Sequence, residues 1–335
     1  MRNFLRAHPN EVRLFFGLLA LVVALSFASK SFLTAGNVTS LLNNNAVNVI
    51  WAVGLLVVLI AGGIDISFAV AASVTQVLCA HIFAALGGGN WLIGLSFAGV
   101  IGIAIGLLNA GLIVAFRIIS IVVTIATYNA LFGLMMFTTS GKFIYDLPDW
   151  WVARIDLIQI PGAHGASASL GLPVAAMACA MAATWFLITH TTTGRQLYAF
   201  GDNPEGARRA GVNVTLMPFI AFGWMGLMAG LGGLMQVNIV QEVVPNALIG
   251  RELDVLAAVV LGGARLGGGR GSVLGCFLGV LLVAITQNGL NLLGVSPYAF
   301  KMVIGVVILI AISSSNLEFS GRSRAARGVA DAQAA

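Results

Sequence analysis

Long uninterrupted runs of apolar residues dominate this chain, and short polar stretches separate them. A helix needs about 17–25 mostly apolar residues to cross the roughly 30 Å hydrocarbon core of a bilayer. By that measure the pattern predicts about ten membrane-spanning or re-entrant helices. They are expected near residues 14–34, 46–61, 66–86, 91–115, 118–139, 170–190, 217–238, 253–263, 271–293 and 297–315.

Two of these runs are shorter than a membrane crossing requires. The run 46–61 is short, and the run from Leu253 to Gly263 is too short to cross alone. We interpret both as parts of broken or re-entrant segments. Such segments are tolerated where surrounding protein or a water-filled cavity satisfies the exposed backbone.

Composition supports a membrane protein, because 59% of the 335 residues are hydrophobic, 9% are charged and the mean hydropathy is +0.98. Soluble domains carry about 25% charged residues. The predicted fold is therefore an all-α polytopic membrane protein with one domain, residues 1–335. Five predicted spans precede the long polar loop 140–169 and five follow it. Two odd-numbered halves place the second half inverted in the membrane, as in many alternating-access transporters.

Basic residues favour the cytoplasmic side of a membrane, and they predict the orientation. With ten crossings and a cytoplasmic N-terminus, 12 of the 17 Lys and Arg residues lie inside. These are Arg2, Arg6, Arg13, Arg117, Arg195, Arg208, Arg209, Arg265, Arg270, Arg322, Arg324 and Arg327, against Lys30, Lys142, Arg154, Arg251 and Lys301 outside. The net charge of +5 then needs no nucleic-acid partner, because anionic lipid headgroups account for it. The first run also has features of a cleaved signal segment, but the assignment above treats it as a span.

Neither a metal site nor an enzyme site is indicated. The three cysteines and four histidines are scattered and form no ligand cluster: Cys79, Cys179, Cys276, His8, His81, His164 and His190. The Gly141–Lys142 pair is followed by Phe143, so the chain has no phosphate-binding P-loop. The glycine-rich stretch "LGGARLGGGRGSVLG", residues 261–275, matches no nucleotide fingerprint, and we interpret it as a tight turn before a close-packed helix.

Glycines repeat every fourth residue in three of the predicted spans. They are Gly102 with Gly106, Gly226 with Gly230, and Gly271 with Gly275 and Gly279. Small residues at this spacing let membrane helices approach closely, so these positions predict packing faces.

The polar insert "TTTGRQLYAFGDNPEGARRAGVNV", residues 191–214, contains the signals of a short helix. Asn203 is a favourable N-cap, Pro204 suits the first helical position and Gly211 suits a left-handed terminator. A helix of about two turns is unstable alone and needs a partner surface. Two readings remain: a docking helix bearing Arg208 and Arg209, or a solvated loop with inside-favouring arginines.

Asp65 is the one clearly internal ionisable residue among the predicted spans. An intramembrane carboxylate is a candidate for a role in transport. Alternatively, Asp65 caps the following helix through the N–H groups of Ser67 and Phe68. Neutral polar residues add weak pathway candidates, namely Asn109, Thr124, Gln287, Asn288 and Asn291. Their amides and hydroxyls suit a neutral, hydroxyl-rich cargo, and equally serve as hydrogen bonds between helices.

The loop 140–169 contains Asp146, Asp149, Trp150, Trp151 and Arg154. Tryptophans at this position are typical of an interfacial aromatic belt. Contact with another protein is the second reading of the same residues.

Four stretches together resemble the membrane permeases of bacterial ATP-binding-cassette importers for ribose, galactose, xylose and autoinducer 2. They are "GGIDIS" (62–67), "GLLNAGLIVAF" (106–116), "GRQLYAFGDNPEGARRAGVNV" (194–214), and "ELDVLAAVVLGGARLGGGRGSVLG" from Glu252 continuing through "QNGLNLLGVSP" to Pro297. Three features depart from the family pattern: Ala69 replaces a glycine, the stretch Ile118–Thr127 lacks a proline, and Gly206 replaces an alanine. These departures bear on substrate identity rather than on the class of protein.

This resemblance implies a fold like that of the vitamin-B12 importer, in the bacterial inner membrane. Two permease subunits would each dock on a cytoplasmic ATPase, and a periplasmic sugar-binding protein would deliver the sugar. The chain itself would be no enzyme and hold no cofactor, since ATP and Mg²⁺ bind the ATPase. The N-tail 1–13, the coupling loop 191–216 and the C-tail 316–335 would be cytoplasmic, and the loop 140–169 periplasmic. The helix from Pro204 to Ala210 would be the coupling helix, with Asn203, Pro204, Glu205, Gly206, Ala207, Arg208, Arg209 and Gly211 forming the ATPase contact.

Two other functions compete with an importer. An ion-coupled secondary transporter would use intramembrane carboxylates or histidines. The predicted spans offer few such candidates, namely Asp65 and His81. A polytopic membrane enzyme would need a nucleophile, a base or a metal cluster, and the sequence shows no such constellation.

Overall fold

The computed structural model describes residues 9–161, 167–296, 299–300, 302 and 305–306. Nearly all the secondary structure is helical. The helices are α2 (Pro9–Ala28), α3 (Ala35–Ile60), α4 (Phe68–Leu86), α5 (Trp91–Phe116), α6 (Ser120–Thr139), α7 (Asp149–Val152), α8 (Leu172–His190), α9 (Thr192–Asp202), α10 (Pro204–Arg209), α11 (Leu216–Val240), α12 (Arg251–Leu261) and α13 (Val273–Leu292). The strands β1 (Asp156–Pro161) and β2 (Ser167–Gly171) pair antiparallel.

Among the described residues, eight helices are long and apolar enough to cross a membrane: α2, α3, α4, α5, α6, α8, α11 and α13. The all-α polytopic fold is thereby confirmed. The short run 253–263 corresponds to α12, which has only 11 residues, so it does not cross alone. Most of the predicted run 297–315 lies outside the described residues.

The interpretation of 46–61 as a broken segment is wrong. This run is the second part of α3, a continuous helix of 26 residues. The asparagines that precede the apolar run are helical too, because distant groups satisfy their amides. Asn37 pairs with Asn288 of α13, and Asn43 bonds the backbone of β2 and Gly171.

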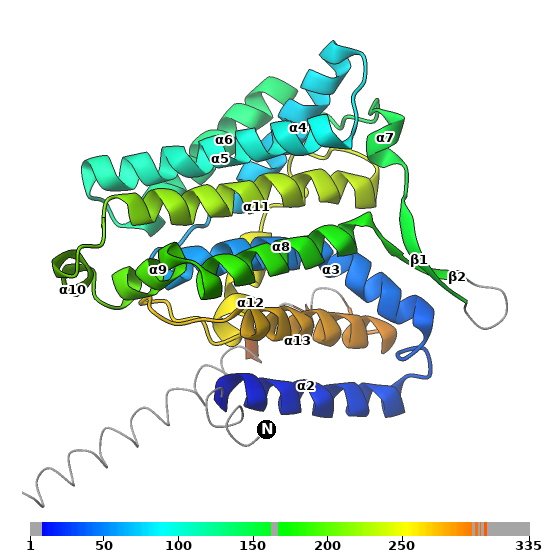
Figure 1. Ribbon diagram of the computed structural model, residues 1–335. Helices are drawn as coiled ribbons and strands as arrows, with labels where there is room; N and C mark the ends of the chain where they lie inside the picture. Colours follow the sequence, from blue (N-terminus) through cyan, green and yellow to red (C-terminus); the bar gives the residue numbers. More distant parts are fainter. Residues whose placement is uncertain (1–8, 162–166, 297–298, 301, 303–304, 307–335) are drawn as a thin grey trace, which may run out of the picture.

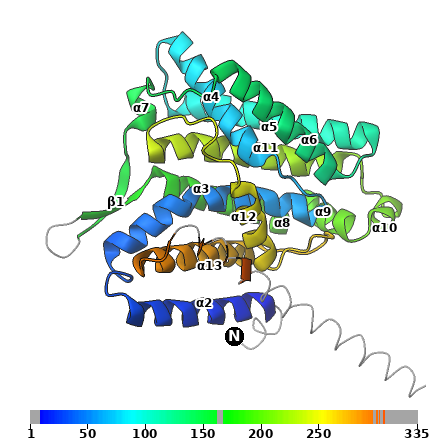
Figure 2. The ribbon, with the colours of Figure 1, turned by 180° about the vertical axis from the view of Figure 1, so that it is seen from behind.

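The spans lie side by side. Helix α3 lies in the middle of the bundle in both opposite views (Figures 1 and 2). From Val49 to Ile60 every residue of α3 is buried. The short helix α10 lies at one end of the bundle, which we call the α10 end. The β1–β2 hairpin and α7 lie at the opposite end, which we call the hairpin end.

Helices α5 and α11 pack through glycine faces, as the repeat predicted. A methyl group added to Gly102 would overlap the carbonyl oxygen of Gly226, and one added to Gly226 would overlap that of Gly102. The two backbones therefore touch with no side chain between them, which maximises van der Waals contact in a bilayer.

The predicted aromatic belt is wrong for Trp151, whose side chain is fully buried. Its indole N–H donates to the Leu234 carbonyl oxygen at 2.9 Å, and its ring lies 5.2 Å from that of Phe83. Asn238 of α11 donates in turn to the Trp151 carbonyl at 2.7 Å. Trp151 can be buried because its indole N–H keeps a hydrogen-bond partner, the Leu234 carbonyl oxygen. The loop at the hairpin end is consequently fixed to the spans.

Candidate functional site

Helix α10 forms where the capping signals predicted it. The side-chain oxygen of Asn203 accepts a hydrogen bond of 2.9 Å from the Gly206 N–H. At the other end, the N–H of Gly211 donates to Arg208 O and that of Val212 to Ala207 O, both at 3.0 Å, which is the Schellman pattern. Gly211 has φ +86°, the left-handed conformation that glycine adopts without strain. The helix ends at Arg209, one residue before the predicted end.

The side chains of α10 are almost all exposed. Only Ala207 is buried, with 4% of its surface accessible, whereas Pro204, Glu205, Arg208 and Arg209 are exposed. The Arg209 Nε lies 3.2 Å from the Glu205 carboxylate, and both side chains are more than half exposed, at 79% and 62%. Such a surface pair contributes little to stability. Within α10, Ala207 is therefore the residue that packs on the bundle, and the charged side chains are exposed.

The segment before α10, expected to be loop, is the helix α9. Thr191 caps it by accepting a hydrogen bond from the Gly194 N–H at 3.0 Å. Leu197 is fully buried, and the Tyr198 hydroxyl donates to the Gly271 carbonyl at 2.7 Å. Burial raises the pKa of Tyr198 to about 12. The signal for this helix was the threonine cap followed by Gly194, Leu197 and Gly201, which are three and four residues apart and form its buried face.

Residues 61–67, which include the "GGIDIS" stretch, form a non-helical break between α3 and α4. The Asp65 carboxylate accepts hydrogen bonds of 2.7 Å from both the amide and the hydroxyl of Ser67, rather than from Phe68 N–H. The Ser67 hydroxyl accepts a bond of 2.8 Å from the Asn109 amide of α5. The break is therefore held by a continuous buried network.

The start of α6 completes this network. The N–H of Ile64 donates to the Ser120 hydroxyl at 2.9 Å, and the N–H of Ile66 donates to the Thr124 hydroxyl at 3.3 Å. The structure thus brings together three of the sequence candidates, Asp65, Asn109 and Thr124, each at most 3% exposed. Their contacts favour a structural role for Asp65, because they satisfy unwound backbone inside the bundle, although Asp65 does not bond the Phe68 N–H as the predicted cap required.

The other three candidates lie apart from this network, on α13. Asn288 exchanges two hydrogen bonds with Asn37 of α3, Gln287 is half-buried and Asn291 is exposed. The Asn288 contact is a bond between helices, so the structure does not unite these residues with Asp65 in one site.

Asp65 is not the only internal carboxylate. Glu252, at the start of α12, is 7% exposed, and both of its oxygens accept from the Gly250 N–H at 3.0–3.1 Å. Arg251, which the sequence placed in an outer loop, is half-buried and donates to the Gln236 side chain at 3.2 Å.

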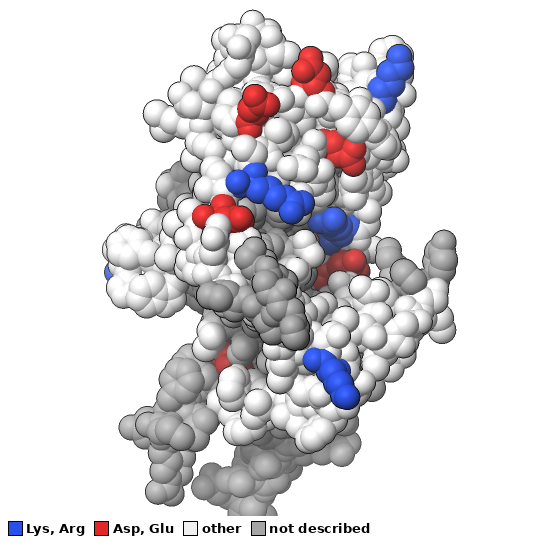
Figure 3. All heavy atoms as spheres, turned by 90° about the vertical axis from the view of Figure 1, so that its right-hand side faces the viewer, with Lys and Arg blue, Asp and Glu red and all other residues white. Residues whose placement is uncertain are grey.

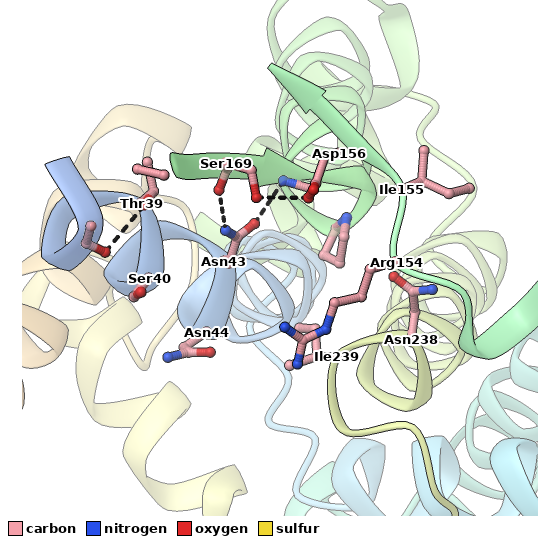
Figure 4. A pocket seen from close by; sticks show the side chains of 14 residues that line it. Thr39, Ser40, Asn43, Asn44, Arg154, Ile155, Asp156, Ser169, Asn238 and Ile239 are labelled. Carbon is pink, nitrogen blue, oxygen red and sulfur yellow. Dashed lines mark hydrogen bonds between the residues drawn. The ribbon is translucent and has the colours of Figure 1, made fainter. Parts of the chain in front are cut away.

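A polar cavity of about 260 Å³ opens at the hairpin end, between the start of α3, the hairpin and the end of α11 (Figure 4). Asn43 fixes one wall by donating to Ser169 O at 2.8 Å and accepting from Gly171 N–H at 2.9 Å. The Arg154 side chain extends across the cavity toward Ile239. The sequence did not reveal this cavity, because its walls come from separate segments, 36–44, 154–156, 168–173 and 238–239.

Comparison with known proteins identifies the class. A family described as "Branched-chain amino acid transport system / permease component" matches residues 37–312. The ribose import permease protein of Escherichia coli is 34% identical over 94% of this chain and 96% of its own length. The autoinducer 2 import system permease protein of Photorhabdus luminescens is 30% identical over 95% of this chain and 91% of its own, and the fructose import permease protein of Rhizobium meliloti 28% over 93% and 87%.

No solved structure matches the chain. The family match covers most of its length and includes both the break at 61–67 and α10. The eight long apolar helices agree with an integral membrane permease. The chain therefore belongs to the family of transport-system permease components.

Proposed function

We propose that this protein is the membrane permease of an ATP-driven importer, and that it carries a neutral monosaccharide or a related polyol. The observation that carries the proposal is α10, a capped helix that projects from one end of the bundle with a single buried residue, Ala207. A helix of six residues has little stability of its own. Its preformed, exposed shape is explained by docking on a separate ATPase subunit, which would bind ATP and Mg²⁺.

The distribution of charge supports a cytoplasmic location for the α10 end. Exposed arginines gather on the elements at this end, namely Arg117, Arg195, Arg208, Arg209 and Arg265. The hairpin end instead carries acidic and basic side chains interspersed (Figure 3). By the positive-inside rule the hairpin end faces the periplasm of an inner membrane, where a binding protein would deliver the sugar.

Both chain termini are proposed to be cytoplasmic. The Ser272 hydroxyl donates to the Glu11 carboxylate at 2.9 Å, which brings the start of α2 to the α10 end. The C-tail 316–335 lies outside the described residues, so its side follows from the sequence pattern alone.

The sugar assignment rests on the relatives together with the chemistry of the chain. Relatives that match over nearly their full length are named for ribose, fructose and autoinducer 2, whereas the family description names an amino acid. Amide and hydroxyl groups such as Asn43, Asn44, Ser40 and Ser169 line the polar cavity. Such groups exchange hydrogen bonds with a polyol without holding it as a fixed charge would.

A second permease subunit is proposed to cover α6. The middle of this span exposes an amide, Asn129, beside the small residues Ala126, Ala130 and Gly133. Asn129 donates to Ile125 O at 2.8 Å, but an exposed amide facing lipid tails still costs free energy. A subunit packed on this small-residue face would remove the amide from lipid.

Reversal of charge on α10 tests the proposal. In Arg208→Glu with Arg209→Glu, we expect the cognate ATPase to stop co-purifying, while the permease remains folded. Lys142→Glu with Arg154→Glu is the control, since it makes the same charge change at the opposite end. Unchanged association in the α10 variant would refute the docking assignment.

A further inference from the structure

Three segments of backbone meet at the α10 end with no side chain between them. They are the end of α3 at Ile60, the end of α9 at Gly201, and the glycine-rich loop 262–272. The Gly269 N–H donates to the Ile60 carbonyl oxygen at 2.9 Å. A methyl group on Gly201 would overlap that same oxygen and would lie 2.8 Å from Gly269 N. We call Ile60, Gly201, Gly268 and Gly269 the glycine junction.

Glycine is required in this junction for two separate reasons. Gly268 and Gly269 have φ of +84° and +73°, which other residues adopt only with strain. A methyl on Gly268 would also lie 2.8 Å from the Gly201 Cα. Because backbone meets backbone directly, a displacement of one segment cannot be absorbed by a change of side-chain rotamer.

The junction connects the two features that define the candidate sites. On one side, α9 leads into α10 through a single residue, Asn203. On the other side, Ile60 is the last residue of α3 and is followed by the break at 61–67. A second contact joins the same elements, since the Tyr198 hydroxyl of α9 donates to Gly271 O at 2.7 Å.

We propose that Gly201, Gly268 and Gly269 are positioning residues that transmit a displacement of α10 to the break at 61–67. This inference rests on the proposed function, in which α10 receives the movement of the ATPase. The α9 backbone contacts both Ile60 and the glycine-rich loop 262–272. A displacement of α9 therefore shifts the start of α4 and the start of α13 together. Transmission of this kind needs contacts that differ between two states of a packed element.

The inference requires a readout at the break that does not depend on knowing the cargo. A reporter cysteine, Ile64→Cys, is placed in the break, and the exposed Cys179 is replaced by alanine. The permease is reconstituted with its ATPase in liposomes. Maleimide labelling of the reporter is then compared without nucleotide and with ATP plus vanadate. We expect the labelling rate to change by about fivefold or more between these states.

In Gly201→Ala, we expect the ATPase to remain bound and to hydrolyse ATP, while the labelling rate no longer changes with nucleotide. Gly267→Ala is the matched control in the same loop, because a methyl there meets only Arg265 Nε, at 3.7 Å, and the control should respond as the parent does. Tyr198→Phe removes one hydrogen bond without any steric overlap, and it should reduce the response even if Gly201→Ala does not fold.

A full response in Gly201→Ala with the ATPase bound would overturn the inference, as would a full response in Tyr198→Phe where Gly201→Ala cannot be prepared. That failure differs from failure of the docking proposal. The docking proposal is refuted when Arg208→Glu with Arg209→Glu leaves the ATPase attached, whatever the reporter does.

Discussion

Asn37 of α3 and Asn288 of α13 exchange two hydrogen bonds, each 2.9 Å long, across 251 positions of sequence. The pair joins the central helix to the last long span that the structure describes. Loss of Asn288 would therefore remove the partner of the Asn37 side-chain oxygen, while the Asn37 NH2 group would keep its bond of 2.8 Å to the Phe32 carbonyl oxygen.

We expect Asn288→Leu to lower the free energy of unfolding by about 0.6–2 kcal/mol, the range for interhelical hydrogen bonds in membranes. Thermal unfolding in detergent measures the change. The double variant with Asn37→Leu should lose less than the sum of the two single variants, because both remove the same contact. Strict additivity would contradict a direct interaction.

Gly226→Ala should destabilise the protein by about 1–3 kcal/mol, because the new methyl overlaps the Gly102 carbonyl oxygen and forces α5 and α11 apart. Gly111→Ala on α5 is the control, since no atom lies within 4 Å of a methyl there. Alanine favours helix formation by about 1 kcal/mol over glycine, so the control should be neutral or stabilising. Equal losses of thermal stability in the two variants would contradict close contact of the glycine faces.

Asp65→Asn separates the structural role of this residue from a role in ion coupling. The asparagine oxygen can still accept from the Ser67 amide and hydroxyl, so we expect the fold and uptake of the cargo to be retained. Asp65→Ala removes the acceptor and should destabilise the break by about 1–3 kcal/mol. Uptake in proteoliposomes with the ATPase is the measurement. Loss of uptake in a folded Asp65→Asn protein would favour a charge-dependent role.

Gly211 fixes the end of α10, and its φ of +86° predicts which replacements are tolerated. Asparagine enters the left-handed region far more readily than a β-branched residue. We therefore expect Gly211→Asn to keep ATPase affinity within a few fold, and Gly211→Val to weaken it about tenfold through strain of roughly 1–2 kcal/mol. Titration of the purified ATPase gives the affinities, and equal affinities would show that the terminator does not shape the docking helix.

Features encoded by neighbouring residues were predictable from the sequence. The caps of α10 depend on Asn203 and Gly211, which lie within one short segment. Features that depend on distant partners were not. The true start of α3 escaped prediction because Asn37 and Asn43 look too polar for a span until Asn288 and Gly171 satisfy them.

Two further differences have the same physical origin. Trp151 resembled an interfacial residue because nothing near it in sequence reveals the Leu234 carbonyl that receives its N–H. Glu252 was not expected inside the bundle because nothing near it in sequence reveals the packing that buries the start of α12. In both cases the surroundings, rather than the residue type, determine burial.

The slender attachment of α10 has an evolutionary consequence. Since Ala207 alone anchors that helix, substitutions on its outward positions leave the interior of the bundle untouched. Under the proposed function, selection can therefore alter which ATPase the permease recruits independently of what it carries. Exchanging these six residues of α10 between homologues should change which ATPase binds the permease, while the cargo preference should stay with the rest of the chain.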